Sequence, residues 1–331
     1  MEKKIIMIFL NVLLLIIGFV LLIKGADLFV DGSAALAKNF KVPGLIVGLT
    51  IVALGTSAPE LAVSTSAAIQ GSNEIALSNV VGSNIFNLLC VLGVCAIIHS
   101  VPVDSGIIKR DFPVSILATV FVLAMTCGKA VIKGGVSDHS MDENVGEVGR
   151  ITGIIIIALF VIYIIYLIAD ARKNPEKEEE AANKPILKCA ILILIGLAMI
   201  IGGGQAVVYS AKYIARAAGM TETLIGLTIV AVGTSLPELV TSIVAARKGE
   251  TGLAIGNAVG SNIFNLLLIL GVSAVIHPVA VNLASLYDMI VLIAISIITY
   301  IFAITKRDIN RLEGTLMVLI YVADVVFAAI R

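Results

Sequence analysis

The chain has 331 residues, of which 59% are hydrophobic and only 14% are charged, and its mean hydropathy is +1.07. A soluble domain is about half apolar and about a quarter charged, so this composition excludes an ordinary soluble protein. The formal net charge is zero and says nothing about partners.

Apolar stretches long enough to cross about 30 Å of hydrocarbon recur along the chain. Each should be a helix, because an open sheet edge cannot be left unpaired in hydrocarbon. The predicted fold class is therefore an all-α polytopic membrane protein with ten transmembrane helices. In chain order, the predicted spans are residues 5–36, 44–69, 75–98, 111–128, 151–169, 187–217, 222–246, 252–276, 285–305 and 312–330.

One sequence unit occurs twice, at an offset of 178 residues. Residues 45–61 match residues 223–239 at 12 of 17 positions, and residues 78–99 match residues 256–277 at 16 of 22. We therefore predict two repeats of five helices each. An odd number of spans per repeat would place the two copies upside down relative to each other, as in many secondary transporters.

The repeats define the predicted domains. Residues 1–170 form the first five-helix repeat, residues 171–186 a cytoplasmic linker, and residues 187–331 the second five-helix repeat. The first repeat carries an insertion, which must lie in the polar segment 129–149. Lys and Arg are more numerous in the odd-numbered loops and the linker than on the other side, and basic loops stay in the cytoplasm. Both termini should then be extracytoplasmic, in a plasma (inner) membrane.

The second predicted span contains the sequence GTSAPEL, with a proline and a glutamate among apolar residues. A charge in mid-span costs at least about 2.5–3.5 kcal/mol, so Glu60 needs a reason to be there. Thr56 and Ser57 share its helix face. Pro59 should break the helix and leave the carbonyls near Ala53–Gly55 free to face a ligand. The second repeat has the same pattern in GTSLPEL, with Ala231, Thr234, Ser235, Pro237 and Glu238.

The third and eighth predicted spans add further oxygen-bearing side chains, namely Ser83, Asn87, Ser261 and Asn265. These are hard oxygen ligands, which suit Na⁺ or Ca²⁺ better than a soft metal. Inverted repeats would bring both half-sites together near the midplane, where two glutamates balance one divalent charge. The alternative is that both glutamates are satisfied by interhelical hydrogen bonds and that the small residues only aid packing. Duplication of the whole pattern favours a binding site.

The segments GTSAPE…NVVGSNIFN and GTSLPE…NAVGSNIFN resemble the two α-repeats of the calcium/cation antiporter family, in its sodium/calcium exchanger branch. The resemblance covers both halves, with motifs at residues 53–87 and 231–265, and implies Na⁺/Ca²⁺ antiport by alternating access. It also implies that the long first and sixth spans are paired sliding helices that switch access. The site that it implies consists of Glu60 and Glu238 as the main Ca²⁺ ligands, the carbonyls of Thr56 and Thr234, Ser57 and Ser235 for Na⁺, and Ser83, Ser261, Asn87, Asn265, Ala53 and Ala231.

This chain departs from patterns in the family at two places, and these departures bear on which ions it transports. Potassium-dependent members carry Asp where this chain has Asn265, so potassium co-transport is less expected. Proton-exchanging members show Gly-Asn-x-x-Glu where this chain has Gly-Thr-Ser-x-Pro-Glu, which argues against a proton exchanger. A proton/cation exchanger of the same family is the alternative function. A passive channel is a further alternative that the sequence does not exclude.

Other classes of function find less support. An intramembrane enzyme is not expected, because no His or Lys is placed to activate Ser57 or Ser235. We expect no tightly bound cofactor, no nucleic-acid partner and no obligate protein partner. The expected partners are the transported Ca²⁺ and Na⁺ ions and the lipid bilayer.

Two acidic residues, Asp27 and Asp31, lie at the polar end of the first predicted span. Lys24 lies three residues before Asp27, so an interfacial ion pair between these two is expected. The second repeat has Gln205 where the first has Asp27, so this carboxylate is not part of the symmetric core.

Overall fold

The computed structural model describes residues 2–71, 73–132, 140–141, 143–173, 184–220 and 231–330. Three regions singled out above therefore lie partly outside the described residues. They are the linker, of which residues 174–183 are not described, the start of the seventh predicted span at 221–230, and much of the polar insertion at 133–139 and 142.

The first half of the chain is built mainly of helices, several of which are broken into consecutive pieces. Short π-helical turns, written η, separate some of these pieces. Its elements are α1 (Glu2–Phe40), α2 (Gly44–Val47), η1 (Gly48–Val52), α3 (Ala53–Thr56), α4 (Ala58–Ile69), α5 (Asn73–Phe86), η2 (Asn87–Val91), α6 (Leu92–Ile98), β1 (Val101–Pro102), η3 (Ile107–Asp111), α7 (Phe112–Ile132), β2 (Asn144–Val148) and α8 (Arg150–Lys173).

The second half follows the same order of long and broken helices. Its described elements are α9 (Ile186–Ala217), α11 (Ala231–Thr234), α12 (Leu236–Arg247), α13 (Thr251–Ile263), η5 (Phe264–Ile269), α14 (Leu270–Ile276), β3 (Val279–Asn282), α15 (Leu283–Lys306), β4 (Asp308–Ile309) and α16 (Arg311–Ile330). The helical character of the predicted spans is confirmed wherever residues are described. Among the residues that the structure describes, six helices are long and apolar enough to cross a membrane, or seven if the bent pair Gly44–Thr56 and Ala58–Ile69 is one span. The count of ten spans stays a prediction.

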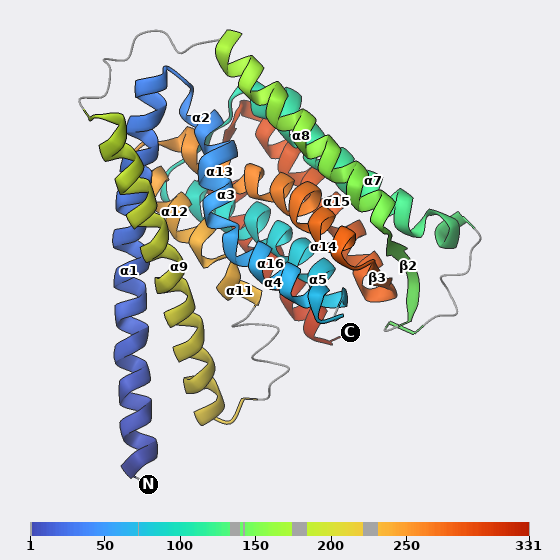
Figure 1. Ribbon diagram of the computed structural model, residues 1–331, viewed down its shortest axis with the longest axis horizontal. Coiled ribbons are helices and arrows are strands. Elements are labelled where there is room, and N and C mark those ends of the chain that lie inside the picture. The colour runs from blue at the N-terminus through green and yellow to red at the C-terminus, as the bar shows by residue number, and fades with distance from the viewer. Residues whose placement is uncertain are drawn as a thin grey trace.

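Helices α1 and α9 lie side by side along one edge of the molecule (Figure 1). Glycines make their contact close. A Cβ atom on Gly203 would lie 2.7 Å from the carbonyl oxygen of Gly18, and one on Gly196 would lie 2.7 Å from that of Gly25. The paired numbers rise on one helix as they fall on the other, so the helices are antiparallel. Small residues at such contacts let backbones approach in membranes, and they make α1 and α9 one tightly packed pair, here called the α1–α9 pair.

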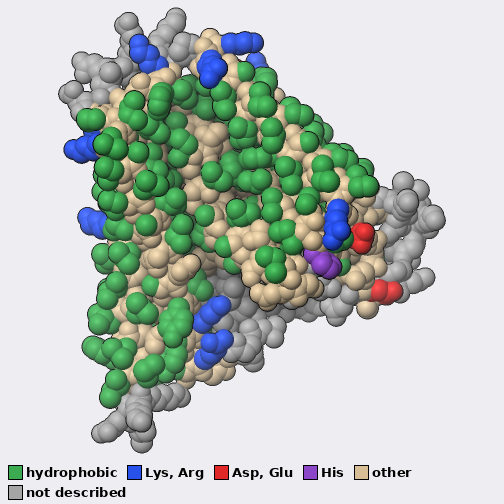
Figure 2. All heavy atoms as spheres, viewed as in Figure 1, with side chains coloured by type: hydrophobic (Ala, Val, Ile, Leu, Met, Phe, Trp, Pro, Cys, Tyr) green, Lys and Arg blue, Asp and Glu red, His purple; other side chains and the backbone are tan. Residues whose placement is uncertain are grey.

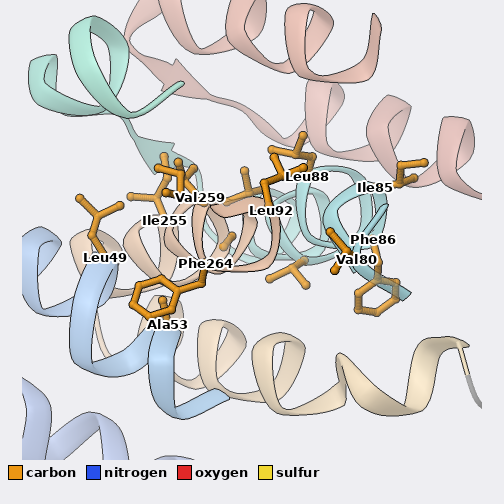
Figure 3. Close-up of a cluster of buried hydrophobic side chains, with 14 of the residues drawn as sticks. Leu49, Ala53, Val80, Ile85, Phe86, Leu88, Leu92, Ile255, Val259 and Phe264 are labelled. Atoms are coloured by element: carbon orange, nitrogen blue, oxygen red, sulfur yellow. The ribbon is translucent and has the colours of Figure 1, made fainter. Parts of the chain in front are cut away.

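The core surrounds α13, which is buried along almost its whole length. Every residue from Leu253 to Ile263 is buried. Figure 3 shows Leu49 and Ala53 of the η1–α3 segment packed toward Ile255 and Val259 of α13. A helix that is buried on all sides carries no solvent-facing stripe, which explains why α13 is apolar with only small polar residues between.

The outer face of the molecule is apolar. Hydrophobic side chains cover most of the face drawn in Figure 2. Large apolar side chains are strongly exposed, among them Phe9 at 67%, Ile151 at 76% and Leu187 at 73%. Soluble monomers rarely expose large contiguous apolar surface, and so many exposed apolar side chains fit contact with lipid.

Two short antiparallel strand pairs join the ends of helices, and the sequence did not predict them. β1 pairs with β4, with Val101 opposite Ile309. β2 pairs with β3 and contains an irregularity between Asn144 and Gly146. They lie in connections between the predicted spans, so the all-α class is unchanged. The strands are two to five residues long, which is too short for a clear alternation of polar and apolar residues.

The expected ion pair between Lys24 and Asp27 is wrong. The partner of Asp27 is Lys248, whose Nζ lies 3.3 Å from Asp27 Oδ1 and 2.7 Å from Asp31 Oδ1. Lys248 is the residue that follows α12. This contact joins two parts of the chain that lie more than 200 residues apart, so spacing along the chain cannot predict it.

Candidate cation-binding site

The two proline-glutamate motifs interrupt their helices at a serine. Helix segments Gly44–Thr56 and Ala58–Ile69 meet at an angle of 49°. Between them, Ser57 has φ −82° and ψ 7°, and the equivalent Ser235 has φ −93° and ψ 7°. The predicted break is therefore confirmed. Pro59 and Pro237 lie in the first turn of the next helix, where the missing N–H leaves no hydrogen bond unmade.

The breaks place both glutamates at helix N-termini. Glu60 lies in the first turn of α4, and Glu238 lies in the first turn of α12. The positive end of the helix dipole favours a carboxylate there. Both side chains are completely buried.

The expectation that the Ala53 carbonyl is free is wrong. It accepts the Ser57 N–H at 3.0 Å, and the Thr56 hydroxyl lies 3.4 Å from it. The break lies at Ser57, one turn beyond Ala53, so this carbonyl stays in the helical pattern. Only its second lone pair can serve a ligand. Ala231 is the first described residue of α11, so its surroundings lie partly outside the described residues.

Each half of the chain supplies a serine to the glutamate of the other half. Ser57 Oγ donates to Glu238 Oε1 at 2.9 Å, and Ser235 Oγ donates to Glu60 Oε1 at 2.9 Å. These two bonds are related by the 178-residue offset of the sequence repeat. The structure thus brings the two duplicated motifs into direct contact, although they are far apart in sequence.

A second pair of serines lies behind the first. Ser83 Oγ is 3.5 Å from Glu60 Oε1, and Ser261 Oγ is 3.5 Å from Glu238 Oε1. Ser235 Oγ also donates to Ser83 Oγ at 3.0 Å. Helices α5 and α13 therefore contribute to the same cluster as α4 and α12.

Several buried oxygens of the predicted site residues have no hydrogen-bond partner among the described residues. Oε2 of Glu60 and Oε2 of Glu238 are both buried and unpartnered. The same is true of Asn87 Oδ1, Asn265 Oδ1 and Thr234 Oγ1. Burying a carboxylate oxygen without a partner costs several kcal/mol, and within the described part of the chain these oxygens are left available to a ligand.

The unpartnered groups have the chemistry of an alkali or alkaline-earth cation site. Carboxylate, amide and hydroxyl oxygens are the ligands that Ca²⁺ and Na⁺ prefer. Within the part of the chain that the structure describes, no group of three or more His, Cys, Asp or Glu side chains could hold a metal. The charge of the cluster therefore comes from the two carboxylates of Glu60 and Glu238, and the surrounding oxygens are neutral.

The asparagines of the two halves are not used equally. Asn265 Nδ2 donates to Asn84 Oδ1 at 2.9 Å, whereas neither polar atom of the equivalent Asn87 has a described partner. Asn87 begins η2, and Asn265 is the second residue of η5. π-Helical turns inside α-helices occur frequently at functional sites, and both of these asparagines are buried in such turns.

The two threonines also differ. Thr56 Oγ1 lies 2.8 Å from Asn257 Oδ1, whereas Thr234 Oγ1 has no partner among the described atoms. The equivalent halves of the site therefore have different hydrogen bonding in this structure, although their sequences match at both positions.

Sequence reasoning missed a set of polar residues that hold the glutamate helices in place. Asn79 Nδ2 lies 3.4 Å from the Glu60 carbonyl oxygen and 3.0 Å from Ser64 Oγ. Asn257 Nδ2 lies 3.2 Å from the Glu238 carbonyl oxygen and 2.8 Å from Ser242 Oγ. A further pair, Asn84 and Asn262, exchanges two bonds of 3.2 Å from each side-chain amide to the other residue's carbonyl. Identity between the two repeats was the signal that could have found them.

Replacing Asn257 by alanine is expected to destabilise the protein by about 1–3 kcal/mol, because its removal leaves buried acceptors unpaired. The measurement is the thermal unfolding midpoint of the purified protein in detergent. Ser66→Ala is the control, since the bond between Ser66 and Gln70 is exposed. An unfolding midpoint of Asn257→Ala equal to that of the control would contradict the assigned role.

A comparison with protein families adds to this geometry. The family model described as sodium/calcium exchanger protein matches residues 10–169 and 188–330. The chain belongs to this family. The matched residues include both segments that form the glutamate cluster described above.

Individual relatives agree with the family over nearly the whole chain. The putative antiporter CaxA of Alkalimonas amylolytica is 36% identical over 312 residues, which cover 93% of this chain and 95% of the relative. The sodium/calcium exchanger MaX1 of Methanosarcina acetivorans is 34% identical, with coverage of 97% and 99%. A solved structure of the sodium-calcium exchanger NCX_Mj, soaked with Na⁺, superposes with a TM-score of 0.81 at 31% identity and covers 98% of this chain and 100% of that chain. Its membership of an exchanger family and its apolar helices together show that this chain is a multi-pass membrane protein.

Proposed function

We propose that this chain is a secondary antiporter that exchanges Na⁺ for Ca²⁺ by alternating access at the site between Glu60 and Glu238. The observation that carries the proposal is the pair of buried carboxylates, each with one unpartnered oxygen. The names of its relatives support the same function, since MaX1 and NCX_Mj are sodium/calcium exchangers. Membership of an exchanger family places the chain among transporters and not among enzymes.

The proposed ion ligands combine two charged groups with many neutral oxygens. Ca²⁺ takes 6–8 oxygen ligands in flexible geometry, and a site that releases ions in turn must not be a rigid cage. The unpartnered oxygens of both glutamates and of both asparagines support this assignment. The full proposed set is Glu60, Glu238, Thr56, Thr234, Ser57, Ser235, Ser83, Ser261, Asn87, Asn265, Ala53 and Ala231.

Charge explains why such a site would exchange ions and not leak them. Two carboxylates in a dry interior can be neutralised by one Ca²⁺ or by several Na⁺. An empty site would leave two negative charges without counterions, which is costly to move through the low-dielectric centre of a membrane. The empty carrier should therefore change access slowly, and the loaded carrier should change access quickly.

We also propose the membrane arrangement behind this mechanism. It consists of ten spans in two inverted five-helix repeats, residues 1–170 and 187–331, joined by a cytoplasmic linker at 171–186. The cross-bonds between equivalent residues at a constant offset of 178 support the pairing of two repeats. The distribution of Lys and Arg supports extracytoplasmic termini in a plasma (inner) membrane. Ca²⁺, Na⁺ and the bilayer are the proposed partners, with no tightly bound cofactor.

The test is uptake of ⁴⁵Ca²⁺ by proteoliposomes that contain the purified chain and are loaded with Na⁺. Uptake should depend on an outward Na⁺ gradient and should stop when Na⁺ is equal on both sides. Uptake that proceeds equally without the Na⁺ gradient would overturn the proposal. Uptake that follows a pH gradient in the absence of Na⁺ would show a proton exchanger instead.

A further inference from the structure

The α1–α9 pair covers both helix breaks of the site. A Cβ atom on Gly55, two residues before Ser57, would lie 3.0 Å from Phe29 of α1 and 3.2 Å from Leu197 of α9. On the other side, a Cβ atom on Gly204 of α9 would lie 3.8 Å from Pro237. A movement of the pair along the rest of the molecule would therefore change the cover over both breaks.

The contact between the pair and the first break is apolar and includes a pocket. A cavity of about 320 Å³ lies there and is lined by Phe29 of α1, Leu197 of α9, and Leu54 and Ser57 beside the first break. Apolar contact is not directional, so it does little to fix one position of the pair against its neighbours. A directional contact is needed to favour one position.

Lys248 supplies such a contact. Its ammonium lies 2.7 Å from Asp31 Oδ1, 3.3 Å from Asp27 Oδ1 and 3.1 Å from the carbonyl oxygen of Asp27. Lys248 follows the last residue of α12, the helix that begins beside Glu238. The contact therefore ties α1 directly to the end of a helix that carries a proposed ion ligand.

The repeat does not reproduce this contact. At the 178-residue offset, Lys248 corresponds to Gln70, Asp27 to Gln205 and Asp31 to Tyr209. None of these three carries a charge at neutral pH. If the opposite access state brings Gln70 close to Gln205 and Tyr209, no ion pair can form between them.

We propose that Lys248, Asp27 and Asp31 form a one-sided electrostatic latch that holds the α1–α9 pair in the position seen here and so sets the balance between the two access states. This inference rests on the proposed alternating access. Partly exposed ion pairs contribute modestly, and removing the latch should change the ratio of the two states about two- to fivefold.

The test compares Lys248→Gln with Arg247→Gln in vesicles that hold the protein in one orientation. Arg247 is the control because it is an adjacent, exposed cation. The apparent KM for Ca²⁺ is measured separately on each face. A change in state balance should raise the KM on one face and lower it on the other, whereas damage to the site would raise both. We expect the ratio of the two values to change about two- to fivefold for Lys248→Gln and to stay unchanged for Arg247→Gln.

The carboxylates are tested in the same way, with Asp27→Asn/Asp31→Asn and with the triple variant that adds Lys248→Gln. If the latch exists, the triple variant should change the ratio no more than Lys248→Gln alone, because both remove the same interaction. Additive effects, or an unchanged ratio in Lys248→Gln, would overturn the latch while leaving exchange by the parent intact. Loss of Na⁺-dependent exchange in the parent itself would instead overturn the proposed function.

Discussion

Glu60→Gln and Glu238→Gln are each expected to lower Na⁺-dependent Ca²⁺ exchange about a hundredfold or more. Each replaces a buried carboxylate by a neutral side chain of the same shape, so the serine bonds to Oε1 can persist and the fold should survive. The cation then loses one of two buried negative charges. Removing one partner of a buried ion pair costs about 3–5 kcal/mol, and each 1.4 kcal/mol is a tenfold change in affinity.

The measurement is Na⁺-dependent ⁴⁵Ca²⁺ exchange in proteoliposomes with equal amounts of folded protein. Glu147→Gln is the matched control, because Glu147 lies exposed in β2. It should exchange Ca²⁺ at the parent's rate. Exchange that survives in both site variants would refute the assignment of the site, even if the parent proved to be an Na⁺/Ca²⁺ antiporter.

Gly196→Ala should destabilise the folded protein, although it adds only one methyl group. That Cβ would lie 2.6 Å from the backbone nitrogen of Phe29 and 2.7 Å from the carbonyl oxygen of Gly25. Both are backbone atoms, so neither can turn away, and α1 must separate from α9. Overpacking of this kind costs about 1–3 kcal/mol.

Gly202→Ala provides the control on the same helix. A Cβ at this position meets nothing within 4 Å. Alanine is favoured over glycine in a helix by about 1 kcal/mol, so this variant should be as stable as the parent or slightly more stable. The two unfolding midpoints in detergent should therefore move in different directions. A Gly196→Ala protein with the parent's midpoint would contradict the close packing of α1 and α9.

The sequence was sufficient for features that repeat or that follow from hydropathy. Apolar length predicted the helices, and the duplicated motifs predicted that Glu60 and Glu238 belong to one cluster. Proline predicted both breaks, because its missing N–H and its ring disturb the helix whatever surrounds it.

Features that depend on contacts across the fold were beyond the sequence. The hydrogen bonds from Ser57 to Glu238 and from Ser235 to Glu60 depend on how the two halves pack. Residue spacing along the chain cannot predict them. The partner of Asp27 was misjudged for the same reason, since a nearby Lys24 was preferred over the distant Lys248. The Ala53 carbonyl was misjudged because the break falls at Ser57, whose own N–H still bonds to that carbonyl.

The exchange of serines between the halves has a consequence for how such a protein can arise and change. Neither half contains a finished site, since each glutamate is completed by a serine of the other half. A single repeat would have to associate with a second copy of itself to form the same cluster. Joining both copies in one polypeptide keeps that association at any concentration and frees each copy to diverge. One example of such divergence is the charged Lys248, whose equivalent in the first repeat is the neutral Gln70.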